Sequence, residues 1–431
     1  MFYPSFDNFS LFKTASFQAL KKLHEIESEK LLKYGYGLTQ KALAPTSFER
    51  QNVELVLQVI NNVVAEGLNL VGAENNILHH KDTADYIKII HRWWSVMNVK
   101  TKYKGDHKLD DFQKPLMKEF ESDPKYKFLI DFGQWLKRWE KMDSNTGCLT
   151  KQTHLAISHT TEAMPALAKY CFDTLNFDYF LPGKIQTDPL EDRFGSYRRL
   201  GGTNYNVSIR QIYEGEEKMR IQIILPLALK SSNYRKLTLS FFNTKNWEDS
   251  ENECKDNLLN TFSINPGDVI AAHDSLPLLT YISGYAAHNL LKKIKCIQCK
   301  FTLLIEKELD FNIHNEWISK LDRGGLKYPH PDVVCISQFT FAIVDKLFSS
   351  KYEEEFLKCK DHRCLVTAIT LDVLDENDIY LGMEECENHN SMYLMKKIVW
   401  VIINILLNNF CKKQNDSILK KKLDKKENSK I

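Results

Sequence analysis

The stretch from Asp188 to Arg198 places carboxylates and arginines close together, and these residue types suit a metal site that faces a phosphate backbone. Carboxylate oxygens are ligands that Mg²⁺ accepts, and a guanidinium group binds phosphate through paired N–H donors. The same residues also specify the start of a helix. Asp188 can act as the N-cap, Pro189 suits the first helical position, and Glu191 completes a capping box. The local sequence therefore supports both a structural and a chemical role for the two carboxylates.

The apolar residues of this stretch follow a helical period. Leu190, Phe194 and Tyr197 recur on one face, and Gly201 is typical of a residue that ends a helix. The pattern predicts a helix over residues 189–200 that displays the charged side chains.

Cys296 and Cys299 have the C-x-x-C spacing of a two-ligand zinc knuckle. A complete Zn²⁺ site needs further ligands, which a second small cluster could supply: Cys359, His362 and Cys364. The alternative is a pair of partly buried thiols in a helical region, because one C-x-x-C motif is weak evidence by itself. The sequence leaves both readings open.

Composition restricts the classes of function. The 431-residue chain is long enough for two or three domains. Its net charge of +2 is uneven, because eight lysines stand against three acidic residues from Lys412 to Ile431, and the rest of the chain is slightly acidic. This excludes electrostatic attraction of DNA over the whole surface, so any DNA contact in the body is a local patch.

Ten cysteines at irregular positions, with no signal-peptide pattern, indicate a reducing compartment such as the cytosol or nucleus. The apolar run from Ile398 to Leu407 is too short to span a bilayer, and Asn404 interrupts it. We therefore expect a buried helix there and no membrane contact. The lysine-rich end after Phe410 is expected to be disordered.

Helical spacing of apolar residues predicts a mostly α segment from 30 to 186, with clear helices at 83–99, 128–142 and 151–172. Another helix is expected at 207–219. Two later segments have strand composition, Arg220–Leu229 and Lys236–Phe242. The tryptophans on helical spacing are expected in the core: Trp93, Trp94, Trp135 and Trp139.

Residues 188–207 resemble the signature of P-element-type transposases, the group that includes the THAP-domain transposases. Further segments resemble other parts of that family in the same order: Leu38–Pro45 followed by Val53–Leu55, Trp93–Asn98, Leu149–Thr153, Tyr281–Tyr285 with Cys296–Cys299, and Asp322–Lys327. The resemblance covers most of the chain and corresponds to roughly the C-terminal half of such a transposase. It implies an RNase H-like catalytic domain that is split by a helical, GTP-binding insertion.

The chemistry that the resemblance implies is cut-and-paste transposition by two Mg²⁺ ions held on three carboxylates. By resemblance Glu191 is the third carboxylate, and Asp7 is the second, in a motif that lacks the family's Pro-His pair. A first Asp would precede Asp7, so we expect this chain to be catalytically incomplete. Arg193 and Arg198 are expected to contact the DNA backbone, with local ion pairs as the alternative.

The resemblance also implies a guanine-nucleotide site that includes Asp188, Asn98 and Val53. The chain departs from the family at two places near this site, because Gly37 stands where relatives tend to have Lys, and Trp94-Ser95 where they have Phe-Asp. Both changes remove charge-assisted hydrogen bonds.

The expected fold is mostly α with a small α/β part, in which a helical insertion domain joins the C-terminal piece of an RNase H-like fold and a largely helical C-terminal region follows. The expected units are a remnant of the RNase H-like domain with its connecting helix (1–33), the GTP-binding-like insertion (34–186), the RNase H-like segment (187–245), the C-terminal region (246–411) and a basic tail (412–431).

Two functions fit these observations. The chain is either the C-terminal portion of a P-element-like DNA transposase or a domesticated or truncated protein that binds DNA or nucleotide without catalysis. A decayed element without function is a third reading, and whether the chain is an enzyme stays open. The expected partners are DNA at transposon ends and target sites, a guanine nucleotide and a second copy of the chain, and the expected location is the nucleus.

Overall fold

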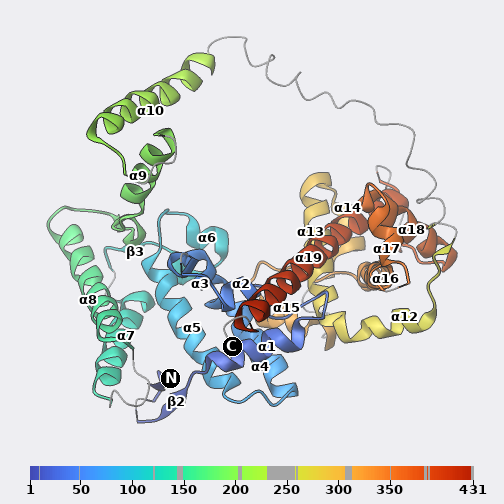
Figure 1. The fold of residues 1–431 in the computed structure, drawn as a ribbon, viewed down its shortest axis with the longest axis horizontal. Coiled ribbons are helices and arrows are strands. Elements are labelled where there is room, and N and C mark those ends of the chain that lie inside the picture. The colour runs from blue at the N-terminus through green and yellow to red at the C-terminus, as the bar shows by residue number, and fades with distance from the viewer. Residues whose placement is uncertain are drawn as a thin grey trace.

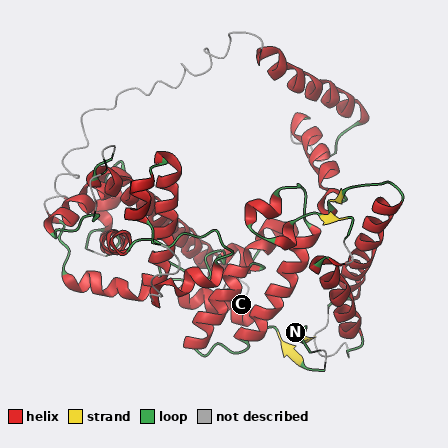
Figure 2. Ribbon diagram, turned by 180° about the vertical axis from the view of Figure 1, so that it is seen from behind, coloured by secondary structure: helices red, strands yellow, loops and turns green. Residues whose placement is uncertain are grey.

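The computed structural model describes residues 1–431 except 9, 48, 120–121, 143–148, 202–205, 231–257, 259–260, 306–312, 350, 383–385, 387–388 and 429–431. Helices dominate these residues, and Figure 2 shows how little of the chain is strand. In the described residues, β1 (Phe2–Pro4) pairs antiparallel with β2 (Phe12–Thr14), and β3 (Leu116–Met117) with β4 (Tyr179–Phe180). The expectation of a mostly α chain with a small β component is confirmed.

The described residues of the first half of the chain form these α-helices: α1 (Phe17–Glu27), α2 (Gln40–Leu43), α3 (Val53–Val59), α4 (Asn62–Glu74), α5 (His80–Met97), α6 (Lys104–Lys108), α7 (Pro124–Glu140), α8 (Lys151–Asp173) and α9 (Asp188–Leu200). The second half continues with these: α10 (Ile209–Lys230), α12 (Pro266–Ala271), α13 (Leu276–Ile294), α14 (Ile297–Leu303), α15 (Glu316–Leu321), α16 (Pro331–Leu347), α17 (Glu353–Lys358), α18 (His362–Glu376) and α19 (Ser391–Asn428). The predicted helices at 83–99, 128–142 and 151–172 correspond to α5, α7 and α8.

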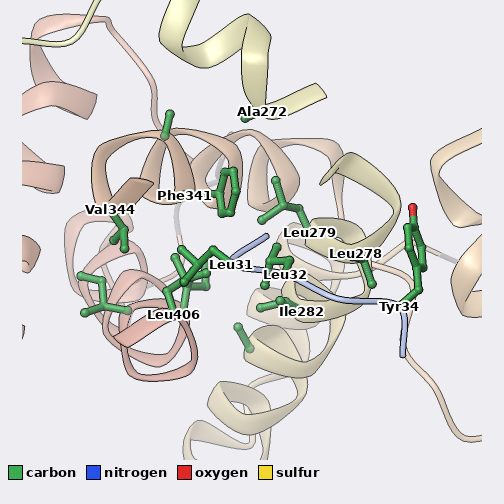
Figure 3. Packing of buried hydrophobic residues seen from close by; sticks show 14 of the residues in the cluster. Leu31, Leu32, Tyr34, Ala272, Leu278, Leu279, Ile282, Phe341, Val344 and Leu406 are labelled. Carbon is green, nitrogen blue, oxygen red and sulfur yellow. The ribbon is translucent and has the colours of Figure 1, made fainter. Parts of the chain in front are cut away.

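The largest hydrophobic core joins the start of the chain to its C-terminal helices. Leu31, Leu32 and Tyr34 extend from the turn after α1 into a cluster with residues of α13, α16 and α19. Figure 3 shows Leu31 near Val344 and Leu406, and Tyr34 beside Leu278. The beginning of the expected insertion domain and the expected C-terminal region therefore share one core.

A second core is aromatic and fixes the N-terminal hairpin. Trp135 and Trp139 of α7 are fully buried beside Tyr3. Their indole N–H groups donate to the backbone carbonyls of Pro4 (2.7 Å) and Phe2 (2.9 Å). Because a buried indole N–H needs a partner, these bonds both satisfy the tryptophans and hold β1 against α7. The core role expected for these two tryptophans is confirmed.

Helices α9 and α10 pack against each other and extend away from the rest of the chain (Figure 1). The helix predicted at 189–200 is confirmed as α9, and Gly201 caps its end. The strand predicted at Arg220–Leu229 is wrong, because these residues continue α10. The segment Lys236–Phe242 lies outside the described residues. A short apolar run fits a helix as well as a strand, which explains the error.

Helix α19 contains the predicted buried helix and then continues beyond it. Ile398, Val399 and Ile402 are fully buried in the main core. The part from Lys412 to Asn428, expected to be disordered, is helical. Asp416 accepts a hydrogen bond from the backbone N–H of Gln40 at 3.3 Å. A helix that has already started adds further turns cheaply, and such tertiary contacts stabilise its end.

Two described segments are long and apolar enough to cross a membrane, judged by length and composition alone: Val53–Glu74 and Ser391–Leu423. The first is interrupted at Ile60–Asn61, where α3 ends and α4 begins. Both segments contribute buried side chains to the main core, as core helices commonly do.

Candidate functional site

Glu191 lies in the first turn of α9 with its side chain exposed. The N-cap of this helix is Thr187, whose hydroxyl donates to Oε1 of Glu191 at 3.0 Å. Asp188, expected as the N-cap, is the first helical residue, and its carboxylate forms an ion pair with the Lys100 ammonium. The capping box predicted from the sequence is therefore wrong, because a lysine distant in sequence takes the carboxylate instead.

The Lys100–Asp188 ion pair brings α9 close to Asn98, another residue expected to bind nucleotide. Asn98 caps the end of α5, and its carbonyl accepts from the Lys104 ammonium at 2.9 Å. Burial, together with the nearby charges of Lys100 and Lys108, lowers the pKa of Lys104. Among the described residues, the side-chain oxygen Oδ1 of Asn98 is buried without a hydrogen-bond partner. An unsatisfied buried acceptor of this kind is uncommon in folded proteins.

Val53 lies at the first turn of α3 and is half exposed. Its neighbours Asn52 and Val56 line an apolar pocket of about 430 Å³ beside α1 and the first half of α5. The structure explains why glycine stands at position 37, where relatives tend to have lysine. A Cβ at this position would lie 2.8 Å from the carbonyl oxygen of Gln58. A lysine at this position would require the backbone to move.

The structure does not bring Asp7 and Glu191 together. Asp7 lies in the N-terminal hairpin, in a small pocket with Asp85 and Ile89 from the middle of α5. Glu191 lies on α9, which meets the chain beyond the end of α5, at Lys100. Figure 1 shows β2 and α9 on opposite sides of α5. These two carboxylates therefore do not form a shared Mg²⁺ site, since both would need to reach the same ions.

Arg193, expected to contact DNA, is engaged within the protein. Its guanidinium pairs with the carboxylate of Glu216 on α10, and its Nε also donates to the Tyr197 hydroxyl at 3.0 Å. Hydrogen bonds to both partners raise the pKa of Arg193. The local ion pair that was the alternative for Arg193 is thus present and joins α9 to α10. Arg198 lies one turn further along α9, partly exposed.

The described residues also enclose a cleft of about 840 Å³ that the sequence did not reveal. One wall comes from α4, α5 and α6, and the other from α13, α15 and the loop that follows α15. Ser95 and the loop residues Asp322–Leu326 both line it, so two motifs of the family resemblance meet there. We call this cavity the charged cleft.

The charged cleft has an excess of cations. Five lysine and arginine side chains line it against three carboxylates: Lys88, Arg92, Lys108, Lys320 and Arg323, with Glu66, Asp110 and Asp322. Three of the cations are paired, since Lys88 contacts Glu66, Arg323 contacts Asp110 and Lys320 contacts Glu316, each at 2.6 Å. Arg92 lies over the Phe112 ring at 4.9 Å. A cavity of this size and charge suits an anionic ligand.

The pKa of His91 depends on the charged side chains of the charged cleft. Burial, followed by the charge of Arg323, lowers the pKa of His91, while Asp110 opposes the shift. The loop opposite is held by Asp322, whose Oδ1 accepts from the backbone N–H groups of Gly324, Gly325 and Leu326 at 2.8 to 3.0 Å. The cations of the loop are therefore presented by a well-bonded turn.

A second group of side chains converges beside α14. The Sγ atom of Cys386 lies 3.7 Å from the Sγ atoms of both Cys296 and Cys299, and His389 Nδ1 lies 3.6 Å from Cys299 Sγ. The hydrogen bond from the Cys299 backbone lowers the pKa of Cys296 to about 7, whereas burial raises the pKa of Cys299 to about 12. One ligand atom from each of these four residues lies within 4.8 Å of the others. We call them the Cys–His cluster, and they could hold a metal ion.

The Cys–His cluster corrects the ligand set considered from the sequence. The residues that the structure brings to Cys296 and Cys299 are Cys386 and His389. Cys359 instead donates to the Glu355 carbonyl at 3.4 Å. Likewise, Nε2 of His362 lies 3.0 Å from the Phe356 carbonyl oxygen. A C-x-x-H spacing at 386–389 was present as a signal, but nothing local connects it to a pair so far away in the sequence.

A comparison with known protein families agrees with the resemblance over residues 268–412. Among solved structures, the Drosophila P element transposase strand transfer complex matches with a TM-score of 0.39 and 19% identity, over 47% of this chain and 44% of that chain. The match thus spans less than half of that transposase chain. A search of curated protein sequences gives no match. Residues 268–412 match the family model of the DNA transposase THAP9, C-terminal domain. Residues 268–412 are therefore similar to the C-terminal domain of the THAP9 transposase, and the resemblance to the C-terminal portion of a P-element-type transposase is confirmed.

Proposed function

We propose that this chain acts in DNA transposition as the C-terminal part of a P-element-type transposase in the nucleus. The THAP9-type domain at residues 268–412 supports this proposal. The chain contributes Glu191 on a projecting helix and needs further carboxylates from outside its own described residues to complete a two-metal site. The need for further carboxylates is supported by the positions of Asp7, beside the middle of α5, and of Glu191, on the helix that meets the chain at Lys100 beyond the end of α5.

We assign DNA contact to the α9 surface rather than to the whole molecule. Helices α9 and α10 project from the body, and Arg193 holds them together through Glu216. Arg198 follows on the same helix and is partly exposed, and we assign its guanidinium to contact with a backbone phosphate. Phosphate contacts of this kind give affinity that depends on salt and does not depend on base sequence.

The charged cleft is the second binding site of the proposal, with a guanine nucleotide as its ligand. Its volume of about 840 Å³ accommodates a nucleotide, and its cations suit a polyphosphate. Asn98, with its buried and unpartnered Oδ1, follows the cleft residue Ser95 by three positions at the end of α5, and Asp188 pairs with Lys100 just beyond it. A guanine base offers N–H donors that such acceptors could satisfy.

Nucleotide binding is tested by titrating the purified chain with fluorescent GTP and competing with GTP, ATP or pyrophosphate. Lys108 is an exposed cation of the cleft, and Lys127 is an exposed lysine of α7 outside it. Lys108→Glu is expected to weaken binding at least about tenfold, because it reverses one charge beside the phosphates. Lys127→Glu is the matched control and should leave affinity unchanged. Equal affinity of both variants would place the nucleotide elsewhere.

DNA binding and cleavage are tested separately. The chain should bind duplex DNA by anisotropy, and Arg198→Ala should reduce both the affinity and its salt dependence by about one phosphate contact. The chain alone should not cleave transposon-end DNA with Mg²⁺. Cleavage that is lost in Glu191→Ala would show that the chain is catalytically complete and would overturn that part of the proposal.

The alternative function is a protein that binds DNA or nucleotide without any catalytic role. The distance between Asp7 and Glu191 favours it as much as it favours an incomplete enzyme. The two are distinguished in cells that contain a complete, related transposase, where the Glu191→Ala variant keeps full activity only if the chain has no catalytic role. A second copy of the chain is also a proposed partner, which sedimentation of the purified protein tests.

A further inference from the structure

The distances between the ligand atoms of the Cys–His cluster match those of a metal site. A tetrahedral Zn²⁺ ion with bonds of about 2.3 Å to sulfur and 2.0 to 2.1 Å to nitrogen separates two sulfurs by ~3.8 Å and a sulfur from a nitrogen by ~3.6 Å. The observed separations are 3.7 Å for Cys296–Cys386 and Cys299–Cys386, 3.6 Å for Cys299–His389 and 3.7 Å for Cys386–His389. Four edges of the expected tetrahedron are therefore present within about 0.2 Å.

Disulfide chemistry does not account for these distances. Bonded sulfurs lie about 2.05 Å apart, whereas these sulfurs lie 3.7 Å apart and the three cysteines are free. Ordinary thiol burial does not account for them either, because it gives no reason for four ligand atoms from two distant segments to converge on one point.

Both halves of the cluster are built by local backbone structure. Lys295 adopts a left-handed conformation (φ 50°) that ends α13, and Cys296 then directly precedes α14. This turn brings Cys299, in the first turn of α14, to the same side as Cys296. In the other half, Cys386 and His389 face each other in an antiparallel bridge, with the His389 N–H donating to the Cys386 carbonyl at 3.3 Å. Each half thus supplies two ligands that lie three positions apart in sequence, a spacing typical of zinc sites.

We propose that Cys296, Cys299, Cys386 and His389 bind one structural Zn²⁺ ion. Three thiolates and an imidazole favour Zn²⁺ over hard cations such as Mg²⁺ and Ca²⁺. All four positions of the tetrahedron are filled by protein ligands, so no position is open for substrate or water, and the site is structural rather than catalytic.

The ion would cross-link two parts of the chain that lie 90 residues apart in sequence. One part is the α13–α14 junction, and the other immediately precedes α19. Cys299 belongs to the main core and is fully buried, so the link reaches into the packed interior and is not confined to the surface. Closing so long a loop restricts the unfolded chain strongly, which makes metal binding a contribution to folding.

The test measures zinc per chain by mass spectrometry of the full protein, purified without added chelator. The wild type is expected to contain one zinc ion, and Cys299→Ser or His389→Ala is expected to lose it. His389→Cys should retain zinc because a four-thiolate site is also tetrahedral. Cys364→Ser removes an exposed cysteine outside the cluster and is the matched control. Zinc-free wild type, or equal zinc in His389→Ala, would overturn the proposal.

A second measurement covers the case in which a ligand variant fails to fold. Replacing zinc by Co²⁺ in the wild type should give the visible absorption of tetrahedral cobalt with thiolate charge-transfer bands. A strong chelator should lower the melting temperature of the wild type and of His389→Cys and leave Cys364→Ser as sensitive as the wild type. Octahedral cobalt bands, or a wild-type melting temperature that no chelator changes, would contradict a structural tetrahedral site.

Discussion

Gly284 of α13 packs directly against the backbone carbonyl oxygen of Lys327, so that two motifs of the family resemblance touch each other. The first motif is Tyr281–Tyr285, and the second is the Asp322–Lys327 loop that lines the charged cleft. A Cβ at position 284 would fall well inside van der Waals contact with that oxygen. Only glycine lets the helix and the loop approach this closely.

Gly284→Ala should therefore lower the free energy of unfolding by roughly 1 to 3 kcal/mol, because the loop must move away from a packed helix. Urea unfolding measures this change. Gly133 on α7 is the matched control, since no atom lies within 4 Å of a Cβ added there. Gly133→Ala should be neutral or stabilising by up to about 1 kcal/mol, as expected in a helix interior. A Gly284→Ala protein as stable as the wild type would contradict the close approach.

The Lys100–Asp188 ion pair is expected to stabilise α9 locally and the whole protein very little. Both side chains are about half exposed, at 41% and 48%, so solvent screens their attraction. Lys100→Met should increase hydrogen exchange in the first turns of α9 by no more than ~5-fold, without a measurable change in melting temperature. Lys127→Met is the control. Unchanged exchange in α9 would mean that its attachment depends on other contacts.

Glu27 should make stability depend on pH. Its buried carboxylate accepts hydrogen bonds from the backbone N–H groups of Tyr34 (2.6 Å) and Gly35 (3.0 Å), yet burial raises the pKa of Glu27 above its ordinary value of 4.5. The folded state thus binds this proton more tightly than the unfolded state. The contribution is fully present below pH 4.5 and is lost as the pH rises through the folded pKa.

Glu27→Gln tests this dependence, because glutamine cannot ionise. Urea unfolding at several pH values should show that the stability difference between wild type and variant changes progressively above pH 4.5, with the wild type losing free energy relative to the variant. The variant also loses one acceptor for a backbone N–H, which shifts its stability by a constant amount. If the stabilities of wild type and variant change in parallel with pH, the pKa of Glu27 is not raised in the folded protein.

His91 should respond to an anion in the charged cleft. Burial and the charge of Arg323 lower its pKa from the ordinary value of 6.5. A bound polyphosphate would offset the Arg323 charge and raise the pKa of His91, so binding should take up protons and strengthen as the pH falls. NMR titration of the His91 ring with and without pyrophosphate measures the shift. A pKa that does not change at saturating ligand would place the ligand away from this histidine.

The sequence predicted the helices better than it predicted their contacts. The apolar period of Leu190, Phe194 and Tyr197 located α9 correctly, because a helical face is a local property. The capping role of Asp188 was wrong because Lys100 pairs with it from a distant part of the chain. The strand expected at Arg220–Leu229 failed because a short apolar run does not distinguish the two structures.

For the site residues, too, the sequence predicted local motifs but not the contacts between them. The C-x-x-C motif identified one half of the Cys–His cluster, but Cys386 and His389 could not be assigned to it without the structure, which brings them beside Cys296 and Cys299. Similarly, the motifs at Ser95 and Asp322 were visible in the sequence, while the cleft between them was not. In both cases the missing information is a contact between segments far apart in sequence, which no local pattern encodes.

Helix α19 is one continuous helix that runs from the Cys–His cluster to the helices near the N-terminus. It begins two residues after His389 and reaches Asp416, which contacts Gln40 at the start of α2. At 1.5 Å per residue, this stretch is ~38 Å long, so a tilt of about 5° at one end moves the other by ~3 Å. The orientation of α19 near His389 therefore determines the position of the lysine-rich end of the chain. A small change of tilt near His389 would displace that end strongly relative to the N-terminal helices.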